Sequence, residues 1–252
     1  MSRTFKVDEL APDGYRIYSD GKFEFDPGVT VLTGCNGVGK TTLMDRMKKE
    51  LDKLDIPWRE HDAVKAKDKL SGWATFSGNR DLVEGALSTM WCSEGESIKA
   101  AFSYMVRNLG YFIMTECADN GTEEAWVFMD SFDSGMSVDN VREVMELLDD
   151  VMIPTRPEGL ELYIVIAANS YEFARCYDCI DVQTARHLSF RSYGDYSAYV
   201  MGTRKQKDIW IKEGPVENGE EEEGAGDGYG RADEAEDAIP RPGRLRARDR
   251  AR

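Results

Sequence analysis

A glycine-rich stretch near the start of the chain, GCNGVGKT at residues 34–41, constrains the fold more than any other feature of the sequence. It fits the pattern GxxxxGK[ST] in full. It also follows an apolar run at residues 29–33 and precedes a segment with helical spacing of apolar residues. Because the pattern binds phosphate only between a strand and a helix, this setting predicts a polyphosphate-binding loop.

The residue types of this loop suit a nucleotide triphosphate with its metal ion. Glycines allow a turn whose backbone N–H groups point inward at phosphate oxygens, and the following helix adds its positive N-terminal end. Lys40 is expected to reach the β- and γ-phosphates and Thr41 to offer its hydroxyl to Mg²⁺. We therefore expect ATP and Mg²⁺ as ligands, with contacts in this loop from Gly34, Asn36, Gly37, Val38, Gly39, Lys40, Thr41 and Thr42.

Three continuous apolar runs predict the central sheet. They lie at residues 29–33, 125–129 and 162–168, and they lack the alternation typical of strands with one face in water. Such runs indicate parallel strands buried on both faces. Segments with helical spacing at 43–54, 98–112 and 141–148 separate them, so we expect a layered α/β fold. The opening residues predict short antiparallel strands with a tight turn at Asp20 and Gly21.

A carboxylate follows the second apolar run. Asp130 directly follows the run AWVFM, at the position where a strand-end aspartate helps to hold Mg²⁺ in nucleotide-binding proteins with such a loop. We therefore predict Thr41 and Asp130 as the metal-binding residues.

Several motifs occur together in an order that a known family shares. NGVGKTTLM, CSEGE (92–96) and VFMDSFDSGMS (127–137) resemble the Walker A, signature, and Walker B plus D-loop motifs of ABC-type ATPases. SEGE, DSGMS and AANSYEFA (167–174) resemble motifs of the SMC/RecF-like group, which includes small bacterial and phage ATPases described as AAA family. The resemblance covers about residues 1–210.

The resemblance implies an α/β P-loop NTPase fold of ABC-ATPase type. Its central sheet would be mostly parallel, with an N-terminal antiparallel β part and a small helical subdomain. It also implies a dimer that sandwiches ATP, in which Ser93 and Gly95 of one subunit meet the γ-phosphate held by Lys40 of the other. For SEGE alone, a plain helix start with Ser93 as cap and Glu96 in the first turn remains an alternative.

Two residues depart from the family pattern. Ser131 stands where a glutamate usually activates water, and Asn169 stands where transporters have a histidine. Asparagine can hydrogen-bond a γ-phosphate but cannot take up a proton. We expect slow hydrolysis with Lys40, Asp130 and Asp133 as the catalytic candidates, and Glu172 as a weaker one. Asp133 could instead cap the following helix or pair with a neighbour.

These features leave three functional hypotheses. The first is a slowly hydrolysing ATPase that dimerises on Mg-ATP, with DNA or a DNA-processing protein as partner by family analogy. The second is an ATP-gated scaffold that does not turn over. The third is a transporter subunit, which ranks last because no glutamine lies between the loop and the signature, where only His61 or Asp62 could serve.

Composition limits the partners and the compartment. The formal net charge of -15 opposes indiscriminate binding to nucleic acid or anionic lipid, so DNA contacts must be local. No apolar run approaches the ~20 residues of a membrane span, and scattered cysteines suit a reducing compartment, so we expect a cytoplasmic protein without a membrane partner. We expect an ATP-binding domain at 1–213 and a disordered acidic and arginine-rich tail at 214–252.

Two further candidates have plain alternatives. Tyr15 or Tyr18 could stack on adenine, or could simply pack in the N-terminal strands. Cys176 and Cys179 form a lone CxxC motif with His187 nearby, and we expect buried thiols rather than a zinc site, which needs four ligands.

Overall fold

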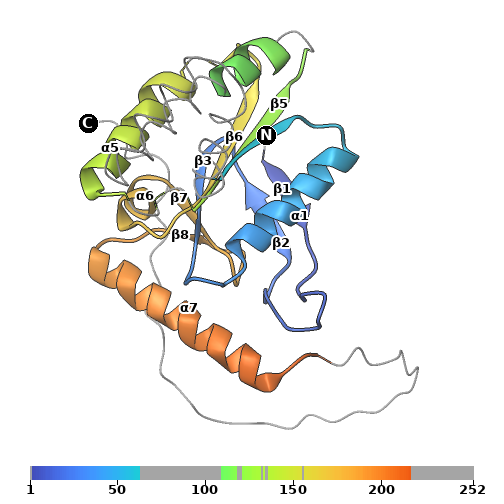
Figure 1. Ribbon diagram of the computed structural model, residues 1–252, viewed down its shortest axis with the longest axis vertical. Helices are drawn as coiled ribbons and strands as arrows, with labels where there is room; N and C mark the ends of the chain where they lie inside the picture. Colours follow the sequence, from blue (N-terminus) through green and yellow to red (C-terminus); the bar gives the residue numbers. More distant parts are fainter. Residues whose placement is uncertain are drawn as a thin grey trace, which may run out of the picture.

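The structure is a computed structural model, shown in Figure 1. It describes residues 2–62, 109–117, 121–131, 133, 136–154 and 156–216.

A six-stranded sheet forms the centre of the molecule (Figure 1). Its order is β4-β5-β6-β3-β7-β8, and all neighbouring strands from β4 to β7 are parallel, while β8 is antiparallel to β7. The prediction of a mostly parallel sheet is therefore confirmed. The strands are β3 (Gly28–Thr33), β4 (Trp58–Asp62), β5 (Glu124–Asp130), β6 (Glu161–Ala167), β7 (Asp178–Asp181) and β8 (His187–Leu188).

Both faces of this sheet are covered, which explains why its strands are apolar without alternation. Along β5, Trp126 and Phe128 belong to one buried cluster, whereas Val127 and Met129 belong to the other. In Figure 1, α1 and the strands β1 and β2 lie on one side of the sheet and α5 and α6 on the other. These elements are α1 (Lys40–Lys53), α5 (Val138–Leu147), α6 (Tyr171–Cys176), β1 (Arg3–Lys6) and β2 (Lys22–Phe25).

The predicted helical periods match α1 and α5 where the structure describes them. α1 buries Leu43, Met47 and Leu51 but ends at Lys53, so that Leu54 is 55% exposed. α5 buries Val141 and Val144 and continues into a π-helical segment at Leu148–Met152. Of the segment predicted at 98–112, only residues 109–112 are described, followed by a π-helical segment at Phe112–Cys117. The expected helical subdomain lies outside the described residues.

The antiparallel N-terminal part is confirmed, but the tight turn at Asp20 and Gly21 is wrong. β1 and β2 pair with Phe5 opposite Phe23, yet the chain between them is a long loop with its own bridge between Leu10 and Arg16. Asp20 accepts a hydrogen bond from the backbone N–H of Lys22 at 2.9 Å, so it ends the loop instead of turning a hairpin. The loop is long because it carries Tyr18 into the core, with 0% exposure.

The longest described helix, α7 (Tyr193–Glu213), lies below the loop that joins β3 to α1 (Figure 1), and its Tyr196 packs in the core cluster on the α5 and α6 side of the sheet. Gly214 ends it, and the N–H of Val216 donates to the carbonyl of Gly14 at 2.9 Å. The rest of the predicted tail, residues 217–252, lies outside the described residues. Within the described ranges, no helix combines the length and apolar character needed to cross a bilayer.

Candidate functional site

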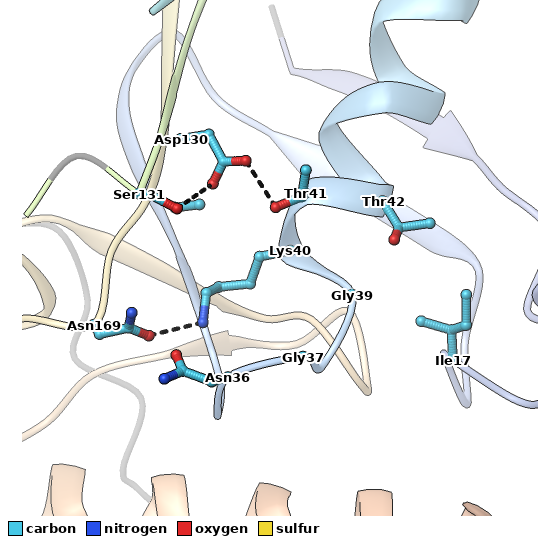
Figure 2. A pocket seen from close by; sticks show the side chains of 11 residues that line it. Ile17, Asn36, Gly37, Gly39, Lys40, Thr41, Thr42, Asp130, Ser131 and Asn169 are labelled. Atoms are coloured by element: carbon cyan, nitrogen blue, oxygen red, sulfur yellow. Dashed lines mark hydrogen bonds between the residues drawn. The ribbon is translucent and has the colours of Figure 1, made fainter. Parts of the chain in front are cut away.

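The strand order brings three predicted segments to one edge of the sheet. β6 lies between β3 and β5, so the chain segments that follow these parallel strands start side by side. The glycine-rich loop follows β3, Asp130 and Ser131 lie at the end of β5, and Asn169 follows β6. Ligands of α/β sheets bind at such carboxyl ends. A pocket of about 290 Å³ opens here (Figure 2), lined by Ile17, Asn36, Gly37, Gly39, Lys40, Thr41, Thr42, Asp130, Ser131, Ala167 and Asn169.

Glycine is needed at the last turn of the loop. Gly39 has a φ of 103°, a conformation that residues with a Cβ rarely adopt, and it directly precedes α1. An added Cβ would lie 2.5 Å from Cγ2 of Ile17 and 3.2 Å from the ring of Tyr18. The Tyr18 hydroxyl in turn donates to the Gly39 carbonyl at 3.0 Å. The loop therefore enters α1 through a turn packed against the N-terminal segment.

Lys40 lies inside the loop and faces the pocket (Figure 2). Its Nζ donates to the carbonyls of Gly34 at 2.8 Å and Cys35 at 3.3 Å, and to Oδ1 of Asn169 at 2.9 Å. Burial lowers the pKa of Lys40, while electrostatic interactions with Cys35, Asp133 and Asp130 act in the opposite direction. Among the described residues, the ammonium group thus binds neutral acceptors, two in the loop and one on Asn169, and forms no ion pair with a carboxylate, which leaves it suited to an anionic ligand.

Thr41 and Asp130 form the second part of the pocket. The Thr41 hydroxyl donates to Oδ2 of Asp130 at 2.7 Å, as Figure 2 shows, and Asp130 is only 7% exposed. No lysine or arginine of the described part forms an ion pair with this carboxylate. A hydroxyl and a carboxylate are hard oxygen donors of the kind that Mg²⁺ takes alongside water and phosphate. The donor set therefore fits the predicted magnesium ion.

Ser131 adopts an unusual backbone conformation directly after Asp130. Its φ of 51° lies in the left-handed region, which non-glycine residues occupy mainly at special positions. Its hydroxyl donates to the other carboxylate oxygen of Asp130 at 3.3 Å (Figure 2). The residue that replaces the expected glutamate thus supports the aspartate and offers no base to a water molecule.

Asp133 holds the backbone of Asn169. Its Oδ2 accepts a hydrogen bond from the Asn169 N–H at 2.7 Å, and its buried Oδ1 has no hydrogen-bond partner among the described residues. Burial raises the pKa of Asp133, which the hydrogen bond from Asn169 and the charge of Lys40 partly offset. Asp133 does not cap α5, whose first turn follows Ser137. Of the two alternatives stated for a non-catalytic Asp133, the structure shows the pairing with a neighbour.

A second group fixes Asn169 from the opposite side of the chain. The Tyr196 hydroxyl, on α7, donates to the Asn169 carbonyl at 2.7 Å. With its N–H on Asp133 and its carbonyl on Tyr196, Asn169 directs its side chain at Lys40. The sequence singled out Asn169 but gave no sign of these two supports.

α7 also contacts the loop itself, which the sequence analysis missed. Oγ1 of Thr203 accepts a hydrogen bond from the N–H of Cys35 at 3.0 Å, and Nζ of Lys207 donates to the carbonyl of Asn36 at 2.9 Å. The two side chains are four residues apart on one helix face. That spacing was visible in the sequence, but nothing in it connected α7 to the loop.

Other predicted residues lie elsewhere. The Val38 side chain is 3% exposed and packs against Gly34 in the core, and neither of these two residues lines the pocket. Glu172 points at Arg142, with 3.5 Å between the charged atoms. Ser93 and Gly95 lie outside the described residues. Ile17, which the sequence did not indicate, forms an apolar wall of the pocket.

The remaining alternatives are also located. Tyr18 is fully buried beneath the loop and cannot stack on a base, whereas Tyr15 lies at the surface. Asp62 ends β4 opposite Asp130 in the strand register. Of the two thiols expected to be buried, Cys179 is buried with its thiol on the Ala174 carbonyl, but the expectation is wrong for Cys176, which is exposed. Across the described ranges, no three histidine, cysteine or acidic residues group as metal ligands.

One comparison with known families gives a match. Residues 10–48 are similar to the family described as AAA domain, a stretch that spans β2, β3, the loop and the greater part of α1. No curated protein matches the chain. Together with the α/β sheet, the similarity supports a nucleotide-binding ATPase of AAA-type P-loop class at a coarse level.

Proposed function

We propose that this chain binds Mg-ATP in the pocket at the edge of β3, β5 and β6 and hydrolyses it slowly. The observation that carries the proposal is the convergence of Lys40, the Thr41–Asp130 pair and Asn169 on one pocket from three strand ends. Each supplies a group that a triphosphate with its metal needs: a cation, hard oxygen donors and a neutral hydrogen-bonding amide.

Local electrostatics favour a polyphosphate in spite of the acidic chain. The start of α1, a helix of 14 residues, presents unpaired N–H groups and a partial positive charge to the pocket. Lys40 adds a full charge that, within the described part of the chain, hydrogen-bonds to neutral oxygens only. Phosphate oxygens are stronger acceptors than carbonyls, so they would replace these partners. Mg²⁺, held by Thr41 and Asp130, would neutralise charge on the β- and γ-phosphates.

Slow turnover follows from the residues that would handle water. Ser131 has no proton-accepting group and its hydroxyl is engaged with Asp130. Asn169 cannot accept a proton. A positioned general base contributes about 10²–10⁴ in rate. Asp133 stays a catalytic candidate, with a raised pKa and one buried oxygen that lacks a partner in the described part, but it does not line the pocket. It could act as a base only through an intervening water.

A single-turnover assay tests the enzymatic part of the proposal. Excess protein is mixed with radiolabelled Mg-ATP, and phosphate release is followed for the wild type, Lys40→Ala and Lys49→Ala. Lys49 is an exposed lysine on the same helix and serves as the matched control. We expect slow release in the wild type and in Lys49→Ala, and none in Lys40→Ala. Equal release in all three proteins would assign the activity to a contaminant.

The hydroxyl of Ser131 on Asp130 favours a second candidate, an ATP-gated scaffold that does not turn over. In this case ATP would bind with the same dependence on Lys40 and would be recovered intact. Analysis of the bound nucleotide after a long incubation separates the two candidates, because only the ATPase yields ADP.

We further propose that two copies of the chain bind face to face around ATP. A triphosphate between two positive helix ends is favourable only when both are present, so nucleotide binding and dimerisation would support each other. Ser93 and Gly95 would supply the second side. Light scattering with and without Mg-ATP tests this: we expect the mass to double with ATP in the wild type but not in Lys40→Ala. A monomer at saturating ATP would rule out the sandwich.

A DNA-associated role is proposed from the SMC/RecF-like motifs. The net charge of -15 predicts weak affinity for duplex DNA at about 150 mM salt, where counterion release gives little gain. Contacts would therefore come from local basic residues, such as Arg204 on α7 and the arginines near the end of the sequence, and only in the ATP-bound dimer. Fluorescence anisotropy of labelled DNA with and without Mg-ATP tests this role, and a signal independent of ATP would contradict it.

A further inference from the structure

Two peptide groups of the loop lie between the pocket and α7, and they have opposite orientations. In the peptide that joins Gly34 to Cys35, the carbonyl accepts from Lys40 and the N–H donates to Thr203 on α7. In the peptide that joins Asn36 to Gly37, the carbonyl accepts from Lys207 on α7. α7 therefore contacts both ends of the turn in the glycine-rich loop.

Because a peptide group is planar, these contacts determine the direction in which each N–H group points. The C=O and N–H of a trans peptide point to opposite sides, and the structure contains no cis bond among its described residues. With its carbonyl on Lys40, the first peptide turns its N–H out to Thr203, as observed. With its carbonyl out on Lys207, the second peptide must turn the Gly37 N–H the other way. Gly37 lines the pocket, so this N–H is directed at the ligand.

The position of Lys207 is set by a rigid support. The carbonyl of Thr203 accepts from Nε2 of Gln183 at 3.2 Å, and the Tyr199 hydroxyl donates to Asp181 at 2.9 Å. Both partners follow or end β7, so α7 is anchored to the sheet one and two turns before Lys207. A Cβ added at Gly37 would lie 3.4 Å from the Lys207 ammonium group, which places this group against the turn itself. In Figure 2 the helix passes directly below Asn36 and Gly37.

We propose that Lys207 is a positioning residue of the phosphate site. By holding the Asn36 carbonyl on the α7 side, Lys207 keeps the Gly37 N–H turned into the pocket before the ligand arrives. Its positive charge lies beside the turn that would bind the phosphates. The inference rests on the proposed binding of Mg-ATP. The hydrogen bond from Lys207 would also couple α7 to the nucleotide, because an interaction that aids phosphate binding is strengthened by that binding in equal measure.

Calorimetry on the full chain tests the role of Lys207. Mg-ATP and inorganic tripolyphosphate are titrated into the wild type, Lys207→Met, Lys207→Arg and Lys205→Met. Lys205 is an exposed lysine on the same helix, so its variant makes the same change of charge away from the loop. Loss of a charge-assisted hydrogen bond predicts about tenfold weaker binding of both ligands to Lys207→Met. Lys207→Arg keeps the donor and should recover most of the affinity, and Lys205→Met should match the wild type.

Amide hydrogen exchange without any ligand supplies a second readout. A peptide covering residues 34–39 should exchange faster in Lys207→Met than in Lys205→Met, because the turn has lost its tether to α7. Should Lys207→Met fail to fold, Lys207→Gln and Lys207→Arg carry the same comparison, with Gln expected to bind weakly and Arg well.

The outcomes separate this inference from the function on which it rests. If the wild type binds neither ligand, the proposed function is wrong and the role of Lys207 falls with it. If the wild type binds and Lys40→Ala does not, the function stands. In that case, equal affinities and equal exchange for the Lys207 and Lys205 variants would overturn the positioning role alone.

Discussion

At the scale of single residues, the site depends on pairs whose partners are far apart in the sequence. Thr41 and Asp130 are 89 residues apart and Lys40 and Asn169 are 129 apart, yet each pair shares a hydrogen bond of less than 3 Å. Each of the four side chains was predicted from local motifs. The chemistry comes from the way the sheet brings them together, which single substitutions can test.

The Thr41 hydroxyl should matter only when magnesium is present. Thr41→Val keeps the shape of the side chain but removes the oxygen that we assign to Mg²⁺. We expect ATP affinity in magnesium to fall about tenfold, the size of one charge-assisted bond, and affinity in the presence of a chelator to stay the same. Calorimetry under both conditions measures this. An equal loss with and without magnesium would show that Thr41 acts on the phosphates or on the fold.

Asp133 should make stability depend on pH. Burial raises its pKa above the ordinary value of 3.8, so the folded state binds a proton more tightly than the unfolded chain does. Its contribution is thus most favourable at low pH and is lost as pH rises through the folded-state pKa. We expect the stability of Asp133→Asn relative to the wild type to improve between about pH 4 and about pH 7. Urea unfolding of both proteins across this range measures the difference, and a difference that stays constant with pH would contradict a raised pKa of Asp133.

At the scale of elements, the glycine-rich loop lines the pocket on one side and packs against Ile17 and Tyr18 on the other. Gly39 and Gly28 both have positive φ values, of 103° and 118°. A Cβ at Gly39 would collide with Ile17, whereas at Gly28 nothing lies within 4 Å. The two positions therefore separate backbone strain from steric overlap.

Gly39→Ala should destabilise the protein more than Gly28→Ala does. Both variants carry the strain of a side chain at positive φ, but only the first also overpacks the loop against Ile17 and Tyr18. We expect the extra loss in free energy of unfolding to be about 1–3 kcal/mol, the usual cost of overpacking. Denaturant unfolding of the two variants gives this difference directly. Equal losses would mean that the loop can move away from its support.

The elements that the sequence predicted are those whose burial is complete. β3, β5 and β6 are covered on both faces, so their apolar runs needed no knowledge of the fold, and α1 has one clear buried stripe. The phosphate-binding loop was equally visible, since its glycines and lysine follow local backbone rules.

α7 could not be predicted in the same way. Its apolar side chains lie on more than one face, with Tyr196 and Trp210 buried but Met201 and Ile209 exposed, so it shows no clear helical period. The hydrogen bonds that join Thr203 and Lys207 to the loop are tertiary contacts, which no local sequence pattern predicts. The long connection before Tyr18 was missed for a related reason, because packing beneath Gly39 overrode the turn preference of Asp20 and Gly21.

At the scale of the whole molecule, the described elements from β1 to α7 pack around one central six-stranded sheet. We propose a domain boundary near residues 213–216, where Gly214 ends α7 and Val216 binds Gly14. The composition after this point, rich in glycine and like charges, has little apolar surface to offset the entropy of ordering.

Removal of residues 217–252 should therefore leave the fold and the site intact. We expect the truncated chain to melt within about 2 °C of the full chain, which corresponds to less than 1 kcal/mol for a domain of this size, and to bind Mg-ATP equally well. Circular dichroism melting and calorimetry measure both. A clear loss of stability or affinity would show that the removed segment packs on the domain.

The most direct test of the whole account is calorimetric titration of Mg-ATP into the purified full-length protein, with Lys40→Ala and Lys49→Ala alongside. The account predicts saturable binding with one nucleotide per chain in the wild type and in Lys49→Ala, and no binding in Lys40→Ala. Absence of binding in a well-folded wild type, or binding unaffected by the loss of Lys40, would contradict the claim that this loop holds a nucleotide triphosphate.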